Sequence, residues 1–93
     1  MGIQRTATVN FGSTPVDTKV FTVSDAGLSG LTYAEAFFMG SDSHADNDAA
    51  AHKQAAALIQ LSCDAPSGTN MNINADVLAG RVTGNFVLRY VAN

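Results

Sequence analysis

The chain has 93 residues and a mass of 9.6 kDa, and 46% of its residues are hydrophobic, which predicts a single domain over residues 1–93. Only 14% are charged, and eight acidic against five basic residues leave a net charge of −3 without any basic run. This charge argues against binding to nucleic-acid phosphates. No segment approaches the roughly eighteen consecutive apolar residues of a membrane-spanning helix, and the first residues lack the apolar core of a signal peptide. We therefore expect neither a membrane partner nor export by a signal peptide.

The first third of the chain alternates in the manner of two half-buried strands. Apolar residues occupy odd positions and polar residues mostly even positions from Ile3 to Phe11, which predicts a strand with one buried face. A turn over residues 12–15 follows, because Gly and Pro interrupt the alternation there. Residues 17–24 alternate again and are rich in β-branched side chains, which predicts a second strand. Two glycines within residues 25–30 then indicate a loop.

The middle of the chain combines an aromatic segment with an alanine-rich one. Residues 33–40 hold three aromatic side chains and are nearly continuous in apolar character, which predicts a third strand. A polar run then precedes six alanines among residues 49–57, a composition that favours a helix. A competing interpretation ends the helix near Lys53 and begins a strand at residue 56, because residues 56–63 alternate. We predict about two helical turns followed by a strand.

The last third begins with a turn over residues 64–68 and continues as two strands. Alternating apolar residues and asparagines over 70–75 predict the first of them. Residues 81–91 predict the last strand, with Gly84 as a bulge. In total, the sequence predicts a mainly β protein of about six strands and one short helix, built as a small antiparallel β-sandwich or a jelly-roll-like barrel.

The predicted core consists of apolar residues on the inward faces of these elements. It comprises Val9, Phe11, Phe21, Val23, Phe37, Ile59, Leu61, Ile73, Phe86, Leu88 and Tyr90. Such a core is thin, because a chain of this length buries only about two-thirds of its unfolded surface on folding. We therefore expect self-association to cover the remaining apolar surface and strand edges.

One cluster of ligand-type side chains stands between the aromatic segment and the helix. It comprises Asp42, His44, Asp46, Asp48 and His52. Its carboxylates suit a hard cation such as Ca²⁺, and its histidines with a carboxylate suit a transition metal. The calcium loop of an EF-hand, however, has Gly at its sixth position and Glu at its twelfth, where this run has Asn47 and Lys53. We therefore interpret the run as a polar loop that caps the helix through Asn47 or Asp48, and predict no metal and no cofactor.

No nucleophile has the neighbours that catalysis requires. Cys63 is the single cysteine, so it forms no intrachain disulfide, and its alternating apolar surroundings predict a buried structural thiol. Ser13, Ser24 and Ser29 do not lie in the Gly-x-Ser-x-Gly elbow of a hydrolase. We predict that the protein is not an enzyme and that it is made in the cytoplasm.

The segments 7–16, 21–25, 41–52 and 84–91 present strand and turn patterns in a characteristic order. In these patterns, which extend over nearly all of the chain, the protein resembles small proteins encoded among the virion genes of tailed bacteriophages. The resemblance implies a β-rich virion component. It is either a capsid decoration protein, also called a cement protein, or a part of a tail tip or fibre.

The resemblance leads us to expect a virion structural protein that binds the capsid lattice and stabilises the shell. Its partner would be the major capsid protein or another virion protein, and a homotrimer would suit the local threefold positions of an icosahedral shell. The residues expected at these contacts are Ile3, Arg5, Arg81 and Arg89. The alternative is a tail-tip or fibre-associated module that binds a receptor or a carbohydrate, with Tyr33, Phe37 and Phe38 stacking on sugars.

Overall fold

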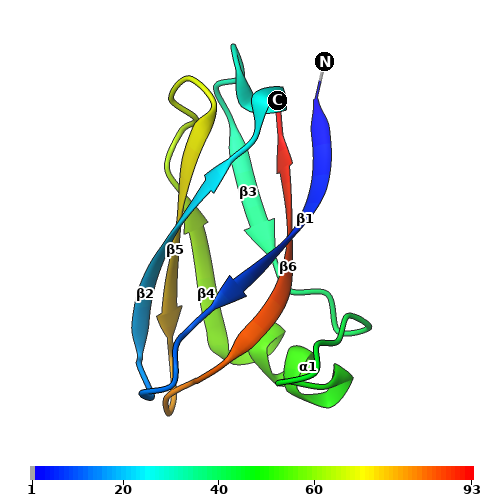
Figure 1. The fold of residues 1–93 in the computed structure, drawn as a ribbon, viewed down its shortest axis with the longest axis vertical. Helices are drawn as coiled ribbons and strands as arrows, with labels where there is room; N and C mark the ends of the chain where they lie inside the picture. Colours follow the sequence, from blue (N-terminus) through cyan, green and yellow to red (C-terminus); the bar gives the residue numbers. More distant parts are fainter. Residues whose placement is uncertain (1) are drawn as a thin grey trace.

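The structure is a computed structural model, and it describes residues 2–93. These residues form two three-stranded antiparallel sheets, with strand orders β1-β6-β3 and β2-β5-β4, and one α-helix (Figure 1). The elements are β1 (Ile3–Asn10), β2 (Thr18–Ser24), the 3₁₀-helix η1 (Ala26–Leu28), β3 (Ala34–Phe37), α1 (Ala49–Leu58), β4 (Ile59–Cys63), β5 (Asn70–Val77) and β6 (Asn85–Ala92). The predicted fold class, a mainly β sandwich of six strands and one helix, is confirmed.

A long antiparallel ribbon joins the two sheets and bends at one end of the molecule. β1 pairs with β6, and β2 pairs with β5, each along its full length. Between these pairs, reciprocal backbone hydrogen bonds of 3.1 and 2.9 Å join Val16 and Val82. Gly12 and Gly84 at the bend have φ angles of 95° and 81°, which other residues rarely adopt. The ribbon therefore continues through the bend, and β3 and β4 lie beside β6 and β5 (Figure 1).

The core lies between the two sheets and is organised around an aromatic cluster. The ring of Phe11 makes edge-to-face contacts with Phe21 and Phe86, with centroid distances of 5.1 and 5.5 Å. Eight of the predicted core residues are buried: Val9, Phe11, Phe21, Ile59, Ile73, Phe86, Leu88 and Tyr90. Val23 and Leu61 are partly buried and pack against them. Alternation thus predicts the inward face of each long strand correctly.

The prediction of Phe37 as a core residue is wrong, because the strand that contains it ends there. Phe37 is half-buried, whereas Phe38 is only 6% exposed and packs against Phe86 at 5.7 Å between ring centroids. The strand predicted over residues 33–40 is therefore only four residues long, and the chain leaves the sheet with Phe38 turned inward. The prediction also missed Leu28, which is fully buried although it lies in the segment expected to be a loop.

Other element boundaries shift by a few residues. α1 has ten residues, more than the two turns expected, because the helix continues through the alanines until Ile59 pairs with Val77 at the start of β4. β6 begins at Asn85 rather than at residue 81. Gly84 lies in the bend that precedes β6 and is not a bulge within the strand.

The aromatic cluster gives a direct test of the packing. We expect Phe86→Ala to lower the free energy of unfolding by about 3–5 kcal/mol, comparable to the whole stability of a small domain, because it leaves a cavity beside Phe11 and Phe38. Urea unfolding followed by circular dichroism measures the change. The control Phe37→Ala, which truncates a half-buried ring, should cost clearly less. An unchanged unfolding midpoint for the Phe86 variant would contradict this core.

Candidate functional site

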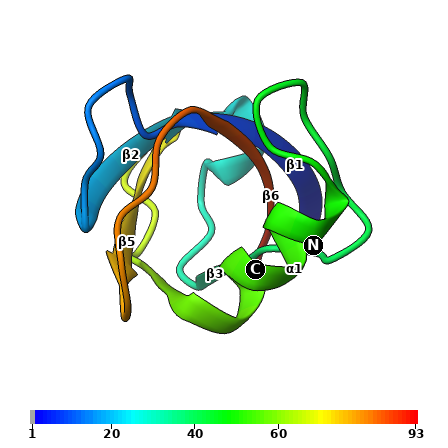
Figure 2. The same cartoon turned by 90° about the horizontal axis from the view of Figure 1, so that it is seen from below.

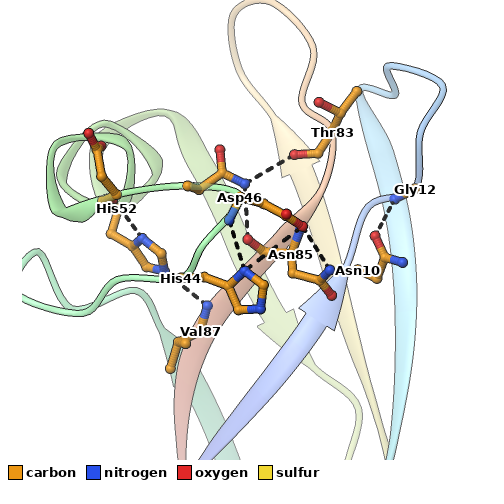
Figure 3. A network of polar contacts seen from close by, with 10 residues as sticks. Asn10, Gly12, His44, Asp46, His52, Thr83, Asn85 and Val87 are labelled. Atoms are coloured by element: carbon orange, nitrogen blue, oxygen red, sulfur yellow. Dashed lines mark hydrogen bonds and ion pairs between the residues drawn. The ribbon is translucent and has the colours of Figure 1, made fainter.

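The ligand-type residues that precede and begin α1 make separate contacts rather than surrounding one point (Figure 3). Asp48 is the N-cap of α1, as predicted, and its Oδ1 accepts a hydrogen bond from the Ala51 N–H at 2.9 Å. The Asp46 N–H donates to Nδ1 of His44 at 3.0 Å, which closes a turn inside the loop. Within residues 2–93, no three His, Cys, Asp or Glu side chains are grouped as a metal site requires.

His52 is the one buried polar residue among the described residues, and both of its ring nitrogens are used. Nε2 accepts a hydrogen bond from the Val87 N–H at 2.9 Å, so the ring proton lies on Nδ1, which donates to the backbone oxygen of Asp48 at 2.9 Å. The ring lies next to Phe38 and Phe86, with centroids 6.5 and 5.1 Å away. His52 therefore joins α1 to β6 as a neutral imidazole, with no lone pair left for a metal.

Asp46 and Asn47 bind the backbone at the start of β6 (Figure 3). Oδ2 of Asp46 accepts hydrogen bonds from the backbone and side-chain amides of Asn85, at 2.9 and 2.8 Å. These two bonds lower the pKa of the Asp46 carboxyl below its ordinary value. Nδ2 of Asn47 donates to the backbone oxygens of Thr83 and Asn85, at 3.2 and 2.9 Å. The loop is thereby fixed to the backbone N–H and the backbone oxygen of Asn85 at the start of β6.

Asp42 forms a bidentate ion pair with Arg89 of β6. The Nε and Nη2 atoms of Arg89 donate to the two carboxylate oxygens at 2.9 and 2.8 Å, and the side chain of Asp42 is only 14% exposed. The hydrogen bonds from Arg89 lower the pKa of the Asp42 carboxyl. Nε and Nη2 of Arg89 are thus engaged within the chain, while its side chain stays 31% exposed.

We call Asp42, Asp46, Asn47 and His52 the β6 clasp. β3 pairs with β6 only as far as Phe37 opposite Arg89, so the edge of β6 beyond that point lacks a neighbouring strand. The clasp provides hydrogen-bond partners there instead, for the backbone of Asn85 and Val87 and for the side chain of Arg89. The polar cluster singled out in the sequence therefore serves the fold.

The other expected contact residues lie in different environments. β6 is the central strand of its sheet, paired with β1 along its length and with β3 from Arg89 to Ala92, whereas β1, which carries Ile3 and Arg5, is an edge strand. Nε of Arg5 lies 3.1 Å from Asp25 Oδ2, and the same oxygen accepts a 2.7 Å hydrogen bond from the Tyr90 hydroxyl. The Tyr90 bond is the main cause that lowers the pKa of Asp25, while burial raises the pKa of Tyr90 to about 12.

Arg81 lies at the rim of a surface hollow that the sequence did not indicate. The hollow has a volume of about 330 Å³ and lies between α1 and residues 77–83. Two large apolar side chains are exposed close by: Leu58, at the end of α1, is 42% exposed, and Leu78 is 65% exposed. Their exposure depends on how residues 77–83 pack against the end of α1. A local sequence pattern does not predict that packing.

The remaining reactive or aromatic candidates are not gathered in one place. Cys63 is half-buried, and burial raises the pKa of its thiol, which makes it a weaker nucleophile at neutral pH. Tyr33 is 53% exposed and donates to Glu35 at 2.6 Å, but Phe38 is buried in the core. Tyr33, Phe37 and Phe38 therefore do not form one exposed platform for sugars.

No known protein family, curated protein or solved structure matches the chain. Within residues 2–93, no helix has both the length and the apolar character that crossing a membrane would demand.

The ion pair between Asp42 and Arg89 predicts a loss of stability in acid. The folded pKa of Asp42 is below its ordinary value of 3.8, so the stabilisation is complete above that value and is lost as the pH falls through the folded pKa. We expect Asp42→Asn to lower the urea midpoint near neutral pH, and the difference from the parent protein to shrink at an acid pH below the folded pKa, where the parent carboxyl is also protonated.

The control is Asp17→Asn, which removes an exposed carboxylate outside the β6 clasp. Its midpoint should stay close to that of the parent protein at both pH values. A constant difference between Asp42→Asn and the parent protein across the acid range would mean that the ion pair contributes nothing through its charge.

Proposed function

We propose that this protein is a structural component of a phage virion, a capsid decoration protein that binds the capsid lattice and stabilises the shell. The proposal rests on the resemblance in strand and turn patterns and on one structural observation. That observation is the unpaired edge formed by β1 and β2, which are edge strands of the two sheets and lie on consecutive parts of the chain. A protein that assembles with many identical neighbours needs such a surface.

The edge has few of the features that prevent strand pairing. Because the Phe11 N–H donates to Gly84 across the ribbon, the backbone groups of the even residues of β1 point away from β6. These residues include Gln4, Thr6 and Thr8, which are exposed and uncharged. Neither strand contains a proline, and Lys19 is the one lysine in them. A second copy can therefore pair with the even residues of β1 without meeting a charge at Gln4, Thr6 or Thr8, while the charged residues of the two strands are Arg5 and Lys19.

Self-association through this edge would produce a ring of copies, and the expected homotrimer is one such ring. Each copy offers two unpaired strands, β1 in one sheet and β2 in the other. A contact between β1 of one copy and β2 of the next is heterologous, and such contacts generate closed rings when the rotation between copies allows it. The trimer would then present three identical lattice-binding surfaces, which strengthens weak contacts through effective concentration.

A charge at the centre of β1 tests the edge. We expect Thr6→Lys to convert a trimer, three times the mass of the 9.6 kDa chain, into a monomer, because its ammonium would stand within the contact. Light scattering coupled to size-exclusion chromatography gives the mass. Thr32→Lys makes the same exchange at an exposed loop residue and should leave the trimer intact. A parent protein that stays monomeric at micromolar concentration, or a Thr6 variant that stays trimeric, would count against this contact.

Virions with and without the protein test the function itself. Particles that lack a decoration protein should release their genome more readily on heating or at low salt, because each copy adds a modest contact that is repeated over the shell. Genome release measured by a dye, alongside adsorption to host cells, separates the possible roles. Equal release from both kinds of particle would overturn the decoration role.

A tail-tip or fibre-associated carbohydrate-binding module is the second candidate, favoured by the outer face of the β2-β5-β4 sheet. Hydroxyl, amide and carboxylate side chains meet there in pairs across the strands. The pairs are Thr18 with Asp76 at 3.1 Å, Thr22 with Asn72 at 2.9 Å and Asn74 with Asp64 at 3.2 Å. Such groups can also bind sugar hydroxyls. Unchanged genome release together with lost adsorption would favour this second role.

A further inference from the structure

The hollow beside α1 has an apolar floor and a polar rim. Its floor includes Ala55, Ile59 and Phe86, which are buried residues of the core. Gln54 and Arg81 are exposed on its rim. The volume of about 330 Å³ is at the lower end of the range for ligand pockets, which suits one or two side chains rather than a large cofactor.

Arg81 is the one charged residue that lines the hollow. The other two arginines of the chain, Arg5 and Arg89, are paired with Asp25 and Asp42, whereas Arg81 has no ion-pair partner among residues 2–93. The backbone next to Arg81 is held in place, because Val82 makes two hydrogen bonds to Val16. The Arg81 guanidinium therefore projects from a fixed backbone at the rim of the hollow, and no carboxylate among residues 2–93 forms an ion pair with it.

Leu58 lines the hollow, and Leu78 extends the exposed apolar surface next to it. The Leu78 N–H donates to the Leu58 backbone oxygen at 2.7 Å, so the two leucines are held together. They are 42% and 65% exposed, and Val77 and Ala79, on either side of Leu78, also line the hollow. An occupant must therefore satisfy an aliphatic surface and one cation at the same time.

We propose that this hollow binds an extended segment of a partner protein in which an Asp or Glu stands next to an aliphatic side chain. The aliphatic side chain would pack on the floor over Ala55 and against the exposed leucines, while the carboxylate would accept hydrogen bonds from the Arg81 guanidinium. Gln54 offers an amide to the backbone of such a segment. The part of this inference that makes the hollow the contact with the capsid lattice rests on the proposed function. The part that makes it a binding site for an acidic, aliphatic segment rests on the hollow alone.

The binding site is tested with two short peptides that differ in one group. Acetyl-Leu-Asp-Leu-amide is titrated into ¹⁵N-labelled protein, and acetyl-Leu-Asn-Leu-amide serves as the uncharged control. We expect the amide signals of residues lining the hollow to shift, and the asparagine peptide to bind about tenfold more weakly, since it lacks the charge-assisted hydrogen bonds to Arg81. Equal binding of both peptides, or shifts that lie elsewhere on the protein, would overturn the proposal.

Two variants that change the net charge by the same amount show whether the aspartate peptide is attracted by Arg81 itself or by the overall charge. Arg81→Gln should reduce binding of the aspartate peptide to the level of the asparagine peptide, whereas Lys53→Gln, at an exposed residue of α1 that does not line the hollow, should leave it unchanged. Leu78→Ser should weaken both peptides alike, because it removes apolar contact and no charge. If Arg81→Gln and Lys53→Gln weaken binding equally, the attraction is one of overall charge and the proposed site is wrong.

The same variants are then added to particles that lack the protein, and the amount bound is measured. This measurement separates the inference from the proposed function. If both proposals hold, particles should bind less of the Arg81→Gln variant than of the Lys53→Gln variant at equal concentration. Peptide binding at the hollow without any occupancy of particles by the parent protein would leave the site standing and refute the lattice role. Full occupancy by Arg81→Gln would refute the hollow as the lattice contact and leave the decoration role intact.

Discussion

β6 needs hydrogen-bond partners along both of its edges, and much of the structure follows from how it obtains them. β1 covers one edge completely, but β3 covers the other only as far as Phe37 opposite Arg89. An unpaired backbone amide is costly where water reaches it poorly, and the Val87 N–H lies in such a part-buried position. The β6 clasp supplies the acceptors and the donor instead. Helix α1 is consequently held against the end of the sandwich, next to β6, as Figure 2 shows from below.

This constraint explains why the polar segment of the sequence is rich in metal-ligand side chains although, among residues 2–93, no three of them are grouped as a metal site requires. A side chain that replaces a strand must offer acceptors to backbone N–H groups, as Asp46 and His52 do, or donors to carbonyls, as Asn47 does. Carboxylates, amides and imidazoles are the same groups that bind cations. Composition and spacing therefore do not separate the two roles, and only the position of β6 decides between them.

The sequence predicts those parts of the fold that depend on local periodicity. Phe86, Leu88 and Tyr90 are buried as alternation predicts, because each face of a long strand meets one environment throughout. The burial of Phe38 in place of Phe37, and of His52 on an alanine-rich helix, follows from where β3 stops along β6. The point where β3 stops depends on its pairing with β6, a strand far away in the sequence, so local periodicity does not predict it. The hollow at Arg81 was missed for the same reason, since residues far apart in sequence line it.

The β6 clasp and the hollow share α1, and this connects the fold to the proposed binding. His52 fixes one side of the helix to Val87, and the hollow is lined by Ala51, Gln54 and Ala55 from the adjoining part of the same helix. Because α1 is held before any partner arrives, the apolar floor is already formed, and binding need not order the helix. The free edge of β1 and β2 belongs to other strands. The proposed self-association and the proposed partner binding would therefore use different surfaces and would not compete.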